Sequence, residues 1–287
     1  MKILNILGLF GLTVIFWITS QKKLVKAESP FVANKLVLKE KLKHDTLTVI
    51  AVGDLMLGSN YPNCSDVPIN NGVFLLKPFE QFLKQGDIVF GNIEGTFLNK
   101  GGIPKGSGNQ VYCFRQPLEM AKILKEKGFN LLSVANNHAN DFGERGLQSS
   151  DSILTNLNIA FAGSLAKPET HLKIKNINIG FTAFAPHKGC QDMNDIENAE
   201  KIVRNLKKAN QIVIVSFHGG SEGEKNQHVT KKTEIFYGQN RGNVYQFAHR
   251  MIDAGADIVI GHGPHVVRAV ELYNNKFIAY SLGNFCT

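Results

Sequence analysis

The feature that most constrains this chain is a repeated pattern in which a short apolar run ends abruptly in glycine, asparagine or histidine. The clearest example is residues 258–265, where Ile-Val-Ile runs into Gly-His-Gly-Pro-His. Such a run, bounded by turn residues, is typical of a strand buried on both faces. Open α/β folds place their ligand sites at the carboxyl ends of these strands. His262 and His265 are therefore candidate metal ligands, because neutral imidazole binds divalent transition metals, although two ordinary hydrogen-bonded histidines are the alternative.

Four more apolar runs carry polar side chains where they end. The runs are 47–52, 87–90, 130–135 and 211–217, and the side chains that follow them include Asp54, Glu94, Asn137, His138, Asp141 and His218. Asp54 alone could cap a turn, and the asparagines around His138 could form an ordinary Asx-rich turn. The five strand ends together carry two acids, an amide beside a histidine and three further histidines. Ordinary turns do not account for so many metal-binding side chains at strand ends. Together they predict a metal site at one edge of a sheet.

The donor types indicate which ions the site would take. A mixture of Asp, Glu, Asn and His is borderline-hard and suits manganese, iron or zinc, and the absence of cysteine from the set argues against a closed structural zinc site. Two neighbouring divalent ions would hold an anionic oxygen between them and generate hydroxide near neutral pH. The residues therefore predict two ions and, as the natural chemistry, hydrolysis of a phosphate ester.

Helical patterns separate the predicted strands. The predicted helices are 73–85, 117–127, 144–157, 195–209 and 243–254, with a short strand at 159–162 and hairpins at 172–184 and 266–281. Residues 96–116 are rich in glycine and asparagine and are expected to form a long loop over the site. Arg115 in this loop is a candidate anion clamp, with a plain surface arginine as the alternative. The 287 residues, 43% of them hydrophobic, predict one α/β domain with a large core.

Residues 1–20 predict an export signal or a membrane anchor. Lys2 precedes a mostly apolar segment, 3–19, whose length lies between that of a signal peptide and that of a spanning helix. Residues 21–46 are lysine-rich and weakly patterned, and we expect them to form a linker. The domain at 47–287 is therefore expected to be extracytoplasmic, either anchored in the membrane or secreted.

The chain is basic, with a formal net charge of +8 and a pI of about 9.2. Its lysines are scattered through helical segments and amino-terminal flanks, and they do not gather with aromatic residues into a nucleic-acid surface. We therefore expect a solvated basic surface and no nucleic-acid partner. Attraction to an acidic polymer or an anionic membrane remains open.

The four cysteines lack the paired spacing of a structural zinc site. Outside the cytoplasm a disulfide can form, and Cys64 with Cys113 is the candidate pair because both lie in loop-like sequence. Free or partly buried thiols are the favoured alternative.

Six motifs together resemble one known family. They are Gly53-Asp54-Leu55-Met56, Asn92-Ile93-Glu94, Ala135-Asn136-Asn137-His138 with Asp141 and Gly143, His218-Gly219-Gly220 with Glu222, Gly261-His262-Gly263-Pro264-His265, and Tyr280-Ser281-Leu282-Gly283-Asn284-Phe285. From about residue 47 to 285 the chain resembles the CapA family of poly-gamma-glutamate capsule synthesis proteins, which is related to the calcineurin-like metallophosphoesterases. The resemblance implies a four-layer αββα sandwich of two mixed β-sheets flanked by helices, with a dinuclear metal site at one edge.

The resemblance also implies roles for individual residues. Asp54, Glu94 and His265 would surround one ion, with Glu94 as a bridge, and Asn137, His218 and His262 would surround the other. His138, oriented by Asp141, would protonate a leaving oxygen or stabilise the transition state. With Arg115, the candidate substrate contacts are Glu222 and Asn284.

The chain departs from the wider phosphoesterases at several points. Met56 stands where they usually have a second ligand histidine, and a thioether is a poor ligand for hard ions. Glu94 occupies the region of their bridging aspartate, and two residues, not one, separate His262 from His265. One metal position is therefore expected to be weak. Relatives usually continue past the position of Asn284, so a terminal strand is expected to be missing.

Two functions follow from these patterns. The ligand set predicts an exported metal-dependent hydrolase of phosphoesters in the cell envelope. The family resemblance also allows a non-hydrolytic component of capsule assembly, which binds an anionic polymer such as polyglutamate beside membrane-bound capsule synthesis subunits.

Overall fold

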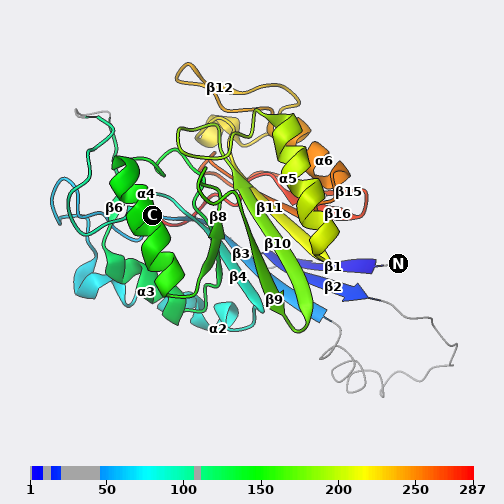
Figure 1. The fold of residues 1–287 in the computed structure, drawn as a ribbon, viewed down its shortest axis with the longest axis horizontal. Coiled ribbons are helices and arrows are strands. Elements are labelled where there is room, and N and C mark those ends of the chain that lie inside the picture. The colour runs from blue at the N-terminus through cyan, green and yellow to red at the C-terminus, as the bar shows by residue number, and fades with distance from the viewer. Residues whose placement is uncertain (1, 9–13, 21–45, 107–110) are drawn as a thin grey trace, which may run out of the picture.

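The computed structural model describes residues 2–8, 14–20, 46–106 and 111–287. Two β-sheets pack face to face, and helices cover the outer face of each sheet (Figure 1). In Figure 1 the helices α3 (Leu118–Glu126) and α4 (Gly143–Asn156) lie on one side of the strands, and α5 (Ile196–Ala209) and α6 (Val244–Asp253) lie on the other. The predicted four-layer αββα sandwich of two mixed sheets is confirmed.

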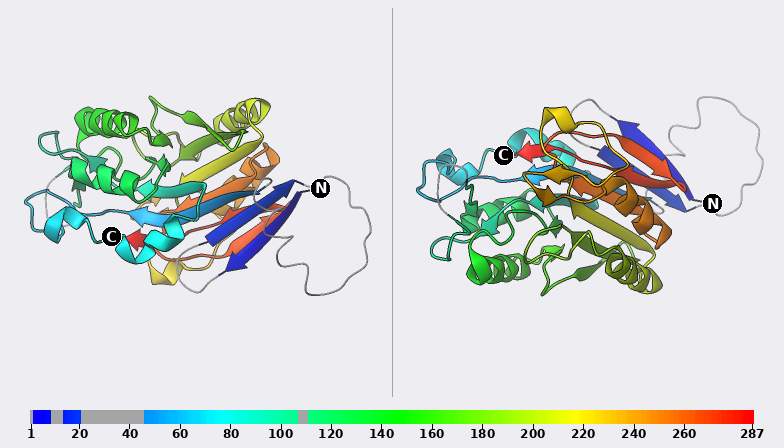
Figure 2. Two further views of the ribbon diagram at one scale, coloured as in Figure 1. Left: turned by 90° about the horizontal axis from the view of Figure 1, so that it is seen from below. Right: turned by 90° about the horizontal axis from the view of Figure 1, so that it is seen from above.

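The first sheet contains four neighbouring parallel strands. Its order is β1 (Lys2–Gly8), β2 (Val14–Ser20), β3 (Thr46–Leu55), β4 (Ile88–Ile93), β7 (Leu131–Ser133) and β8 (Ala160–Ala162). The strands from β3 to β8 are parallel, whereas β2 is antiparallel to both β1 and β3. A last strand, β17 (Asn284–Cys286), runs parallel to the carboxyl end of β3 (Figure 2). The carboxyl ends of β3, β4 and β7 therefore share one edge of the sheet.

The second sheet has a parallel centre and antiparallel borders. Its order is β15 (Val270–Tyr273), β16 (Lys276–Ala279), β14 (Ile258–His262), β11 (Ile212–His218), β10 (Ile177–Phe184) and β9 (Glu169–Ile174). The borders come from two hairpins, β9–β10 and β15–β16, and both predicted hairpins are confirmed. Asn274 and Asn275 in the second turn have φ values of 50° and 57°, which the short turns of hairpins require.

Alternation along the buried strands divides the core into three layers. Val49 and Ala51 of β3 belong to the cluster between the sheets, whereas Ile50 and Val52 belong to the cluster beneath α3 and α4. Across the sheets, the rings of Phe90 and Phe181 lie with their centroids 5.5 Å apart. Each central strand is therefore apolar on both faces because one face meets the other sheet and the opposite face meets helices.

Helices α5 and α6 begin where the sequence provides a capping side chain. The Asp195 carboxylate accepts a hydrogen bond from the Asn198 backbone N–H at 3.1 Å, and the Asn243 side chain accepts one from the Gln246 backbone N–H at 3.0 Å. Such caps satisfy N–H groups that have no partner within the helix. These ends agree with the predicted starts at 195 and 243.

The predicted helix at 73–85 is wrong. The structure has the short 3-10 turns η1 (Ile69–Gly72) and η2 (Lys77–Phe79), followed by α2 (Glu80–Leu83). Pro78 lacks a backbone N–H and fits only the first turn of a helix, so helical structure begins at 77. The loop at 96–116 also contains a two-residue parallel pairing between β5 (Thr96–Phe97) and β6 (Arg115–Gln116).

Three predictions concern the amino terminus and the cysteines. Residues 2–8 and 14–20 pair as an antiparallel hairpin, whereas most of the predicted linker, 21–45, lies outside the described residues. Among the described helices, none has both the length and the apolar character that crossing a bilayer requires. The signal or anchor stays a prediction. Cys64, which is exposed, and Cys113, which is buried, are both free thiols, so the candidate disulfide is not formed.

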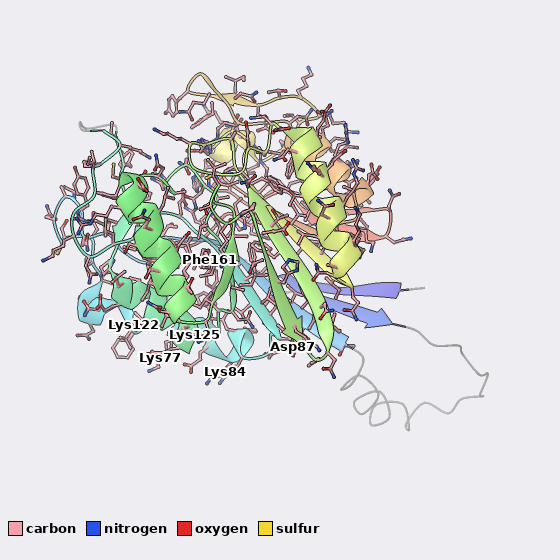
Figure 3. All side chains as sticks on the ribbon, viewed as in Figure 1. Lys77, Lys84, Asp87, Lys122, Lys125 and Phe161 are labelled. Atoms are coloured by element: carbon pink, nitrogen blue, oxygen red, sulfur yellow. The ribbon has the colours of Figure 1, made fainter. Side chains whose placement is uncertain are left out.

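Lysines of the outer helices lie away from the shared strand edge. Lys77, Lys84, Lys122 and Lys125 gather along the lower border of Figure 3, at α2 and α3, and all are exposed. Helices that connect parallel strands run back along the sheet, so these carboxyl-terminal lysines lie near the amino ends of the strands. Lys84 pairs with Glu80 at 2.8 Å. This part of the basic charge belongs to a solvated surface.

We expect Gly53→Ala to destabilise the chain and disturb the end of β17. A Cβ atom at this position would lie 2.0 Å from the Gly283 backbone oxygen, which accepts a hydrogen bond from the Asp54 backbone N–H at 2.9 Å. Overpacking of this kind costs about 1 to 3 kcal/mol of unfolding free energy. Urea denaturation measures the loss, and an unchanged midpoint with an unchanged slope would show that the Gly283 backbone, just before β17, does not press on Gly53.

Candidate metal centre

Strand register brings polar side chains from both sheets to the same edge. Asp54 lies at the carboxyl end of β3, paired with Asn92 of β4, and Glu94 follows β4 directly. In the second sheet His218 and His262 end β11 and β14 and are register partners. Parallel strands end on one side of a sheet, so the sequence order of these residues becomes spatial proximity.

Four of these side chains converge on one point. One donor atom from each of Asp54, Glu94, His218 and His265 lies within 4.8 Å of the others. The same Glu94 oxygen, Oε1, lies 3.4 Å from His265 Nε2 and 3.8 Å from His218 Nε2. Asp54 and His218 are completely buried. The structure therefore groups His218 with the three residues that the resemblance assigned to the first ion.

His262 and His265 approach the two oxygens of a single carboxylate. His262 Nδ1 lies 3.2 Å from Asp54 Oδ1, and His265 Nδ1 lies 3.2 Å from Asp54 Oδ2. His265 has a φ of 58°, a left-handed conformation that is uncommon outside glycine. Its Nδ1 also lies 2.9 Å from Asn284 Oδ1, so β17 supports the ring. The predicted contact between Asn284 and the site is therefore made through His265.

The buried donors fit a bound cation better than they fit one another. No partner with hydrogen-bond geometry exists within the described residues for Asp54 Oδ2, Asn137 Oδ1 or either ring nitrogen of His218 and His262. A buried polar group without a partner costs about 1 to 3 kcal/mol. Burial also lowers the pKa of His218 well below its usual value, so its imidazole is neutral and able to ligate. This donor set fits a borderline-hard divalent ion.

Two members of the cluster hold protons in the absence of a metal. Burial, followed by the charge of Asp54, raises the pKa of Glu94 to about 8. Burial alone lowers the pKa of His265, but its contact with Asp54 and the charges of Glu94 and Asp54 outweigh that effect and raise it to about 10. For Asp54, burial raises the pKa, yet contacts with His262 and His265 bring it well below its usual range.

Asparagine side chains behind the cluster hold it in place. Asn92 Nδ2 donates to Asp54 Oδ1 at 2.8 Å, and Asn136 Nδ2 donates to the Ile93 backbone oxygen at 2.6 Å. The side-chain oxygen of Asn136 in turn accepts from the His138 backbone N–H at 3.0 Å. These amides were not predicted as site residues. The signal in the sequence was, for Asn92, a polar residue inside an otherwise apolar strand and, for Asn136, the polar residue that follows the apolar run at 130–135.

His138 and Asp141 form a buried pair beside the cluster. His138 Nδ1 lies 2.8 Å from Asp141 Oδ2, and His138 Nε2 lies 3.9 Å from Glu94 Oε1. Asp141 also accepts from the Phe114 backbone N–H at 2.6 Å and pairs with Lys105 Nζ at 2.6 Å. Burial lowers the pKa of His138, although Asp141 opposes this effect. A neutral His138 that donates from Nδ1 to Asp141 presents a free Nε2 lone pair towards the cluster.

The predicted substrate contacts have different outcomes. Glu222 Oε1 lies 4.0 Å from His265 Nε2, inside the site. Arg115 is not brought to the cleft. Its guanidinium donates to the side chain and backbone oxygens of Asn60 and to the Gly101 backbone oxygen, and it lies over the rings of Tyr61 and Phe142. These contacts use the guanidinium to hold the loops at Asn60 and Gly101 against β6.

A cleft of about 1190 Å³ opens over the cluster. Its lining includes Lys105, Val111, Tyr112 and Phe114, together with residues of the hairpin of β12 (Ile235–Phe236) and β13 (Gln239–Asn240). Cationic groups in its lining are Lys105, Lys188 and Arg241, and His187 and Met56 also line it. The sequence analysis gave no role to His187, Lys105 or Arg241, because loop residues carry no periodic signal.

The fold and the cluster define a four-layer α/β protein with a centre of histidine and carboxylate donors at a shared strand edge. The chain belongs to the bacterial capsule synthesis protein family PGA_cap, whose model matches residues 48–287. It is 30% identical over 276 residues to the PGA biosynthesis protein CapA of Bacillus subtilis, a match that covers 91% of this chain and 66% of that protein.

A second relative and one solved structure are also similar. The capsule biosynthesis protein CapA of Bacillus anthracis is 29% identical over 264 residues, which cover 85% of this chain and 60% of that protein. The chain therefore spans 60% to 66% of the length of these two relatives. A Staphylococcus aureus protein, provisionally named a 5'-nucleotidase and solved with alpha-ketoglutarate, has a TM-score of 0.46 at 14% identity, covering 80% of this chain and 47% of that one.

Metal affinity is expected to rise with pH. A metal requires unprotonated Glu94 and neutral His265, and both groups keep their protons below pKa values of about 8 and about 10. Acid therefore favours the protonated, metal-free form. For each proton that the metal displaces, the association constant for the metal rises by roughly tenfold per pH unit. Titration calorimetry with Mn²⁺ in buffers of different ionisation enthalpy measures both effects. A flat affinity from about pH 6 to about 9 without proton release contradicts this assignment.

His218→Ala is expected to remove a direct ligand. The loss of affinity for Mn²⁺ or Zn²⁺ should exceed the roughly 10- to 100-fold that follows loss of an outer-shell partner. Elemental analysis after dialysis measures the retained metal. His171→Ala is the matched control, because His171 lies on β9 with a side chain that is 51% exposed, outside the cluster. Equal metal retention by both variants would exclude His218 as a ligand.

Proposed function

We propose that this chain is an extracytoplasmic, metal-dependent phosphoester hydrolase that acts in capsule or cell-envelope polymer metabolism. The observation that carries the proposal is the convergence of Asp54, Glu94, His218 and His265 on one point beside the buried His138–Asp141 pair. Such a reaction needs side chains that bind a metal ion, and it needs a positioned side chain that accepts and donates a proton.

The donor positions support two neighbouring ions. Glu94 Oε1 lies within 4 Å of both His265 and His218, as a bridging oxygen between two ligand groups would. His262, the register partner of His218, and Asn137 Oδ1 in the cleft lining, which has no hydrogen-bond partner among the described residues, supply further candidate donors. Manganese, iron or zinc bound here would act as a Lewis acid and lower the pKa of a bound water. Met56 in the cleft lining is a poor ligand for hard ions, which leaves one of the positions weaker.

His138 is proposed to move the proton. Its Nδ1–H donates to Asp141, which keeps the ring oriented, and its Nε2 faces the cluster. Because burial lowers its pKa, His138 is neutral near pH 7 and can accept a proton at Nε2 from an attacking water. The same nitrogen then returns the proton to the leaving oxygen, so the ring is neutral again after each turnover.

The setting of the reaction is inferred from the family and the amino terminus. The Bacillus relatives are named for capsule and PGA biosynthesis, and the apolar segment at 3–19 suits an export signal or a membrane anchor. We propose an anionic cell-envelope polymer or a phosphoester intermediate as the substrate and membrane-bound capsule synthesis subunits as partners, with no nucleic acid.

A second candidate function is binding of an anionic polymer without hydrolysis. The cationic side chains Lys105, Lys188 and Arg241 in the lining of a cleft of about 1190 Å³ favour it. Measuring turnover of phosphoesters and binding of γ-linked polyglutamate on the same sample separates the two functions. Metal-dependent turnover supports hydrolysis, whereas polymer binding without turnover of any phosphoester supports the second candidate.

His138→Gln is expected to lower kcat for p-nitrophenyl phosphate in the presence of Mn²⁺ by about 10²- to 10⁴-fold, because it removes the proton carrier. Retained metal should not change, since His138 is not among the four clustered donors. Steady-state kinetics and elemental analysis measure the two quantities, with His171→Gln as the control. Turnover equal to that of the unsubstituted chain would remove His138 from the mechanism.

A further inference from the structure

Arg241 is a buried arginine at the edge of the cleft. It follows the hairpin of β12 and β13, and only 3% of its surface is exposed. Its backbone is fixed on both sides, because its N–H donates to the Glu234 oxygen at 2.8 Å and its oxygen accepts from the Gly220 N–H at 2.8 Å. The position of the guanidinium is therefore set by the backbone of the loop that follows His218.

Within the described residues, the Arg241 guanidinium has an ion-pair partner but incomplete hydrogen bonding. Nη2 lies 3.0 Å from Glu222 Oε1, but neither Nε nor Nη2 has a partner with hydrogen-bond geometry within the described residues. Burial lowers the pKa of Arg241, and the Glu222 charge opposes that effect. These two nitrogens form the edge of a guanidinium that binds an oxyanion through two parallel hydrogen bonds.

A second buried arginine, Arg268 after β14, shows how an arginine with a structural role contacts the same loop from outside it. Arg268 is similarly buried, at 4% exposed. Its two terminal nitrogens donate to both Glu234 oxygens at 3.0 and 2.9 Å, and Nη2 also donates to the Ser221 backbone oxygen at 3.0 Å. Arg268 thus uses its terminal donors to hold the loop that carries Arg241. Arg241 has no such pair of hydrogen bonds from Nε and Nη2 within the described residues, where its side chain forms an ion pair with Glu222, so this edge can still donate hydrogen bonds to a ligand.

His187 offers a second unpaired group in the same cleft. Its Nε2 is buried and finds no hydrogen-bond partner in the part of the chain that the structure describes, and its ring centroid lies 6.2 Å from that of His218. Burial lowers the pKa of His187 to about 3, so the ring is neutral and can donate one N–H from Nε2. Both His187 and Arg241 line the cleft beside Glu222.

We infer that Arg241 and His187 form a subsite that binds a non-reacting oxyanion of the substrate next to the metal centre. The Nε and Nη2 edge of Arg241 receives two oxygens of a carboxylate or phosphate, and His187 Nε2–H donates to the same group. Glu222, 3.0 Å from Arg241 and 4.0 Å from His265, lies between the subsite and the cluster. The inference rests on the proposed function only in taking this cleft as the substrate site.

The test measures oxyanion binding directly by titration calorimetry on the full chain, treated with chelator and then reloaded with Mn²⁺. The probes are inorganic phosphate and a γ-linked triglutamate, which distinguish a phosphate source from a carboxylate source. Arg241→Gln should weaken binding of the recognised probe at least tenfold, because it removes a charged two-point contact. Arg241→Lys should recover only part of the lost affinity. An ammonium keeps the positive charge but cannot donate the two parallel hydrogen bonds of a guanidinium.

His187→Gln is the second variant, and it removes a ring whose Nε2 makes no hydrogen bond to the described residues. It should weaken the same probe several-fold without changing the melting temperature. Arg145→Gln is the charge-matched control, because Arg145 is exposed on α4 outside the cleft, and its affinity should equal that of the unsubstituted chain. If Arg241→Gln does not fold, Arg241→Lys and His187→Gln decide the result.

Metal retention on the same samples keeps this inference distinct from the proposed function. Binding that depends on Arg241 and His187 in a chain that retains no metal would leave the subsite standing and remove the hydrolase. Full metal retention with unchanged probe affinity in the folded variants would overturn the subsite and leave the hydrolase standing. Failure of both probes to bind the unsubstituted chain in either metal state would also overturn the subsite.

Discussion

The parallel register of the two central strand pairs is the constraint on which the rest of the structure depends. Pairing of β11 with β14 sets His218 beside His262, and pairing of β3 with β4 sets Asp54 beside Asn92. Because the two sheets also pack face to face through one apolar cluster, both sets of strand ends meet at the same edge. A slip of one residue in either sheet would turn these side chains to the opposite face.

The concentration of buried polar groups opposes folding, and the surrounding structure compensates for it. Asp54 and His218 are fully buried, and His265 adopts a left-handed conformation with a φ of 58°. A hydrogen bond from Asn92 restrains Asp54, and a hydrogen bond with Asn284 restrains His265. Strain and unpaired donors of this kind persist where a surrounding core determines the local geometry, and they gather at binding sites. The centre is therefore prepared for a ligand by the fold.

Sequence patterns predicted the strands and helices well where burial sets a period. The runs at 47–52, 211–217 and 258–260 all became central strands, and the caps Asp195 and Asn243 began their helices as expected. The helix at 73–85 was wrong because its apolar spacing conflicts with Pro78. Arg115 was placed in the cleft on chemistry alone, whereas local contacts with Asn60 and Gly101 hold it elsewhere.

What the sequence by itself determined is the set of donors and their place at strand ends, because an apolar run followed by a polar turn is a local pattern. Only the tertiary structure decided how those donors group. It joined His218 to Asp54, Glu94 and His265, and it brought Arg241 and His187 into the same cleft. These groupings depend on how the two sheets pack and how the loops fold over their edge. Contacts between residues that lie far apart in the chain produce no periodic pattern in the sequence from which they could be predicted.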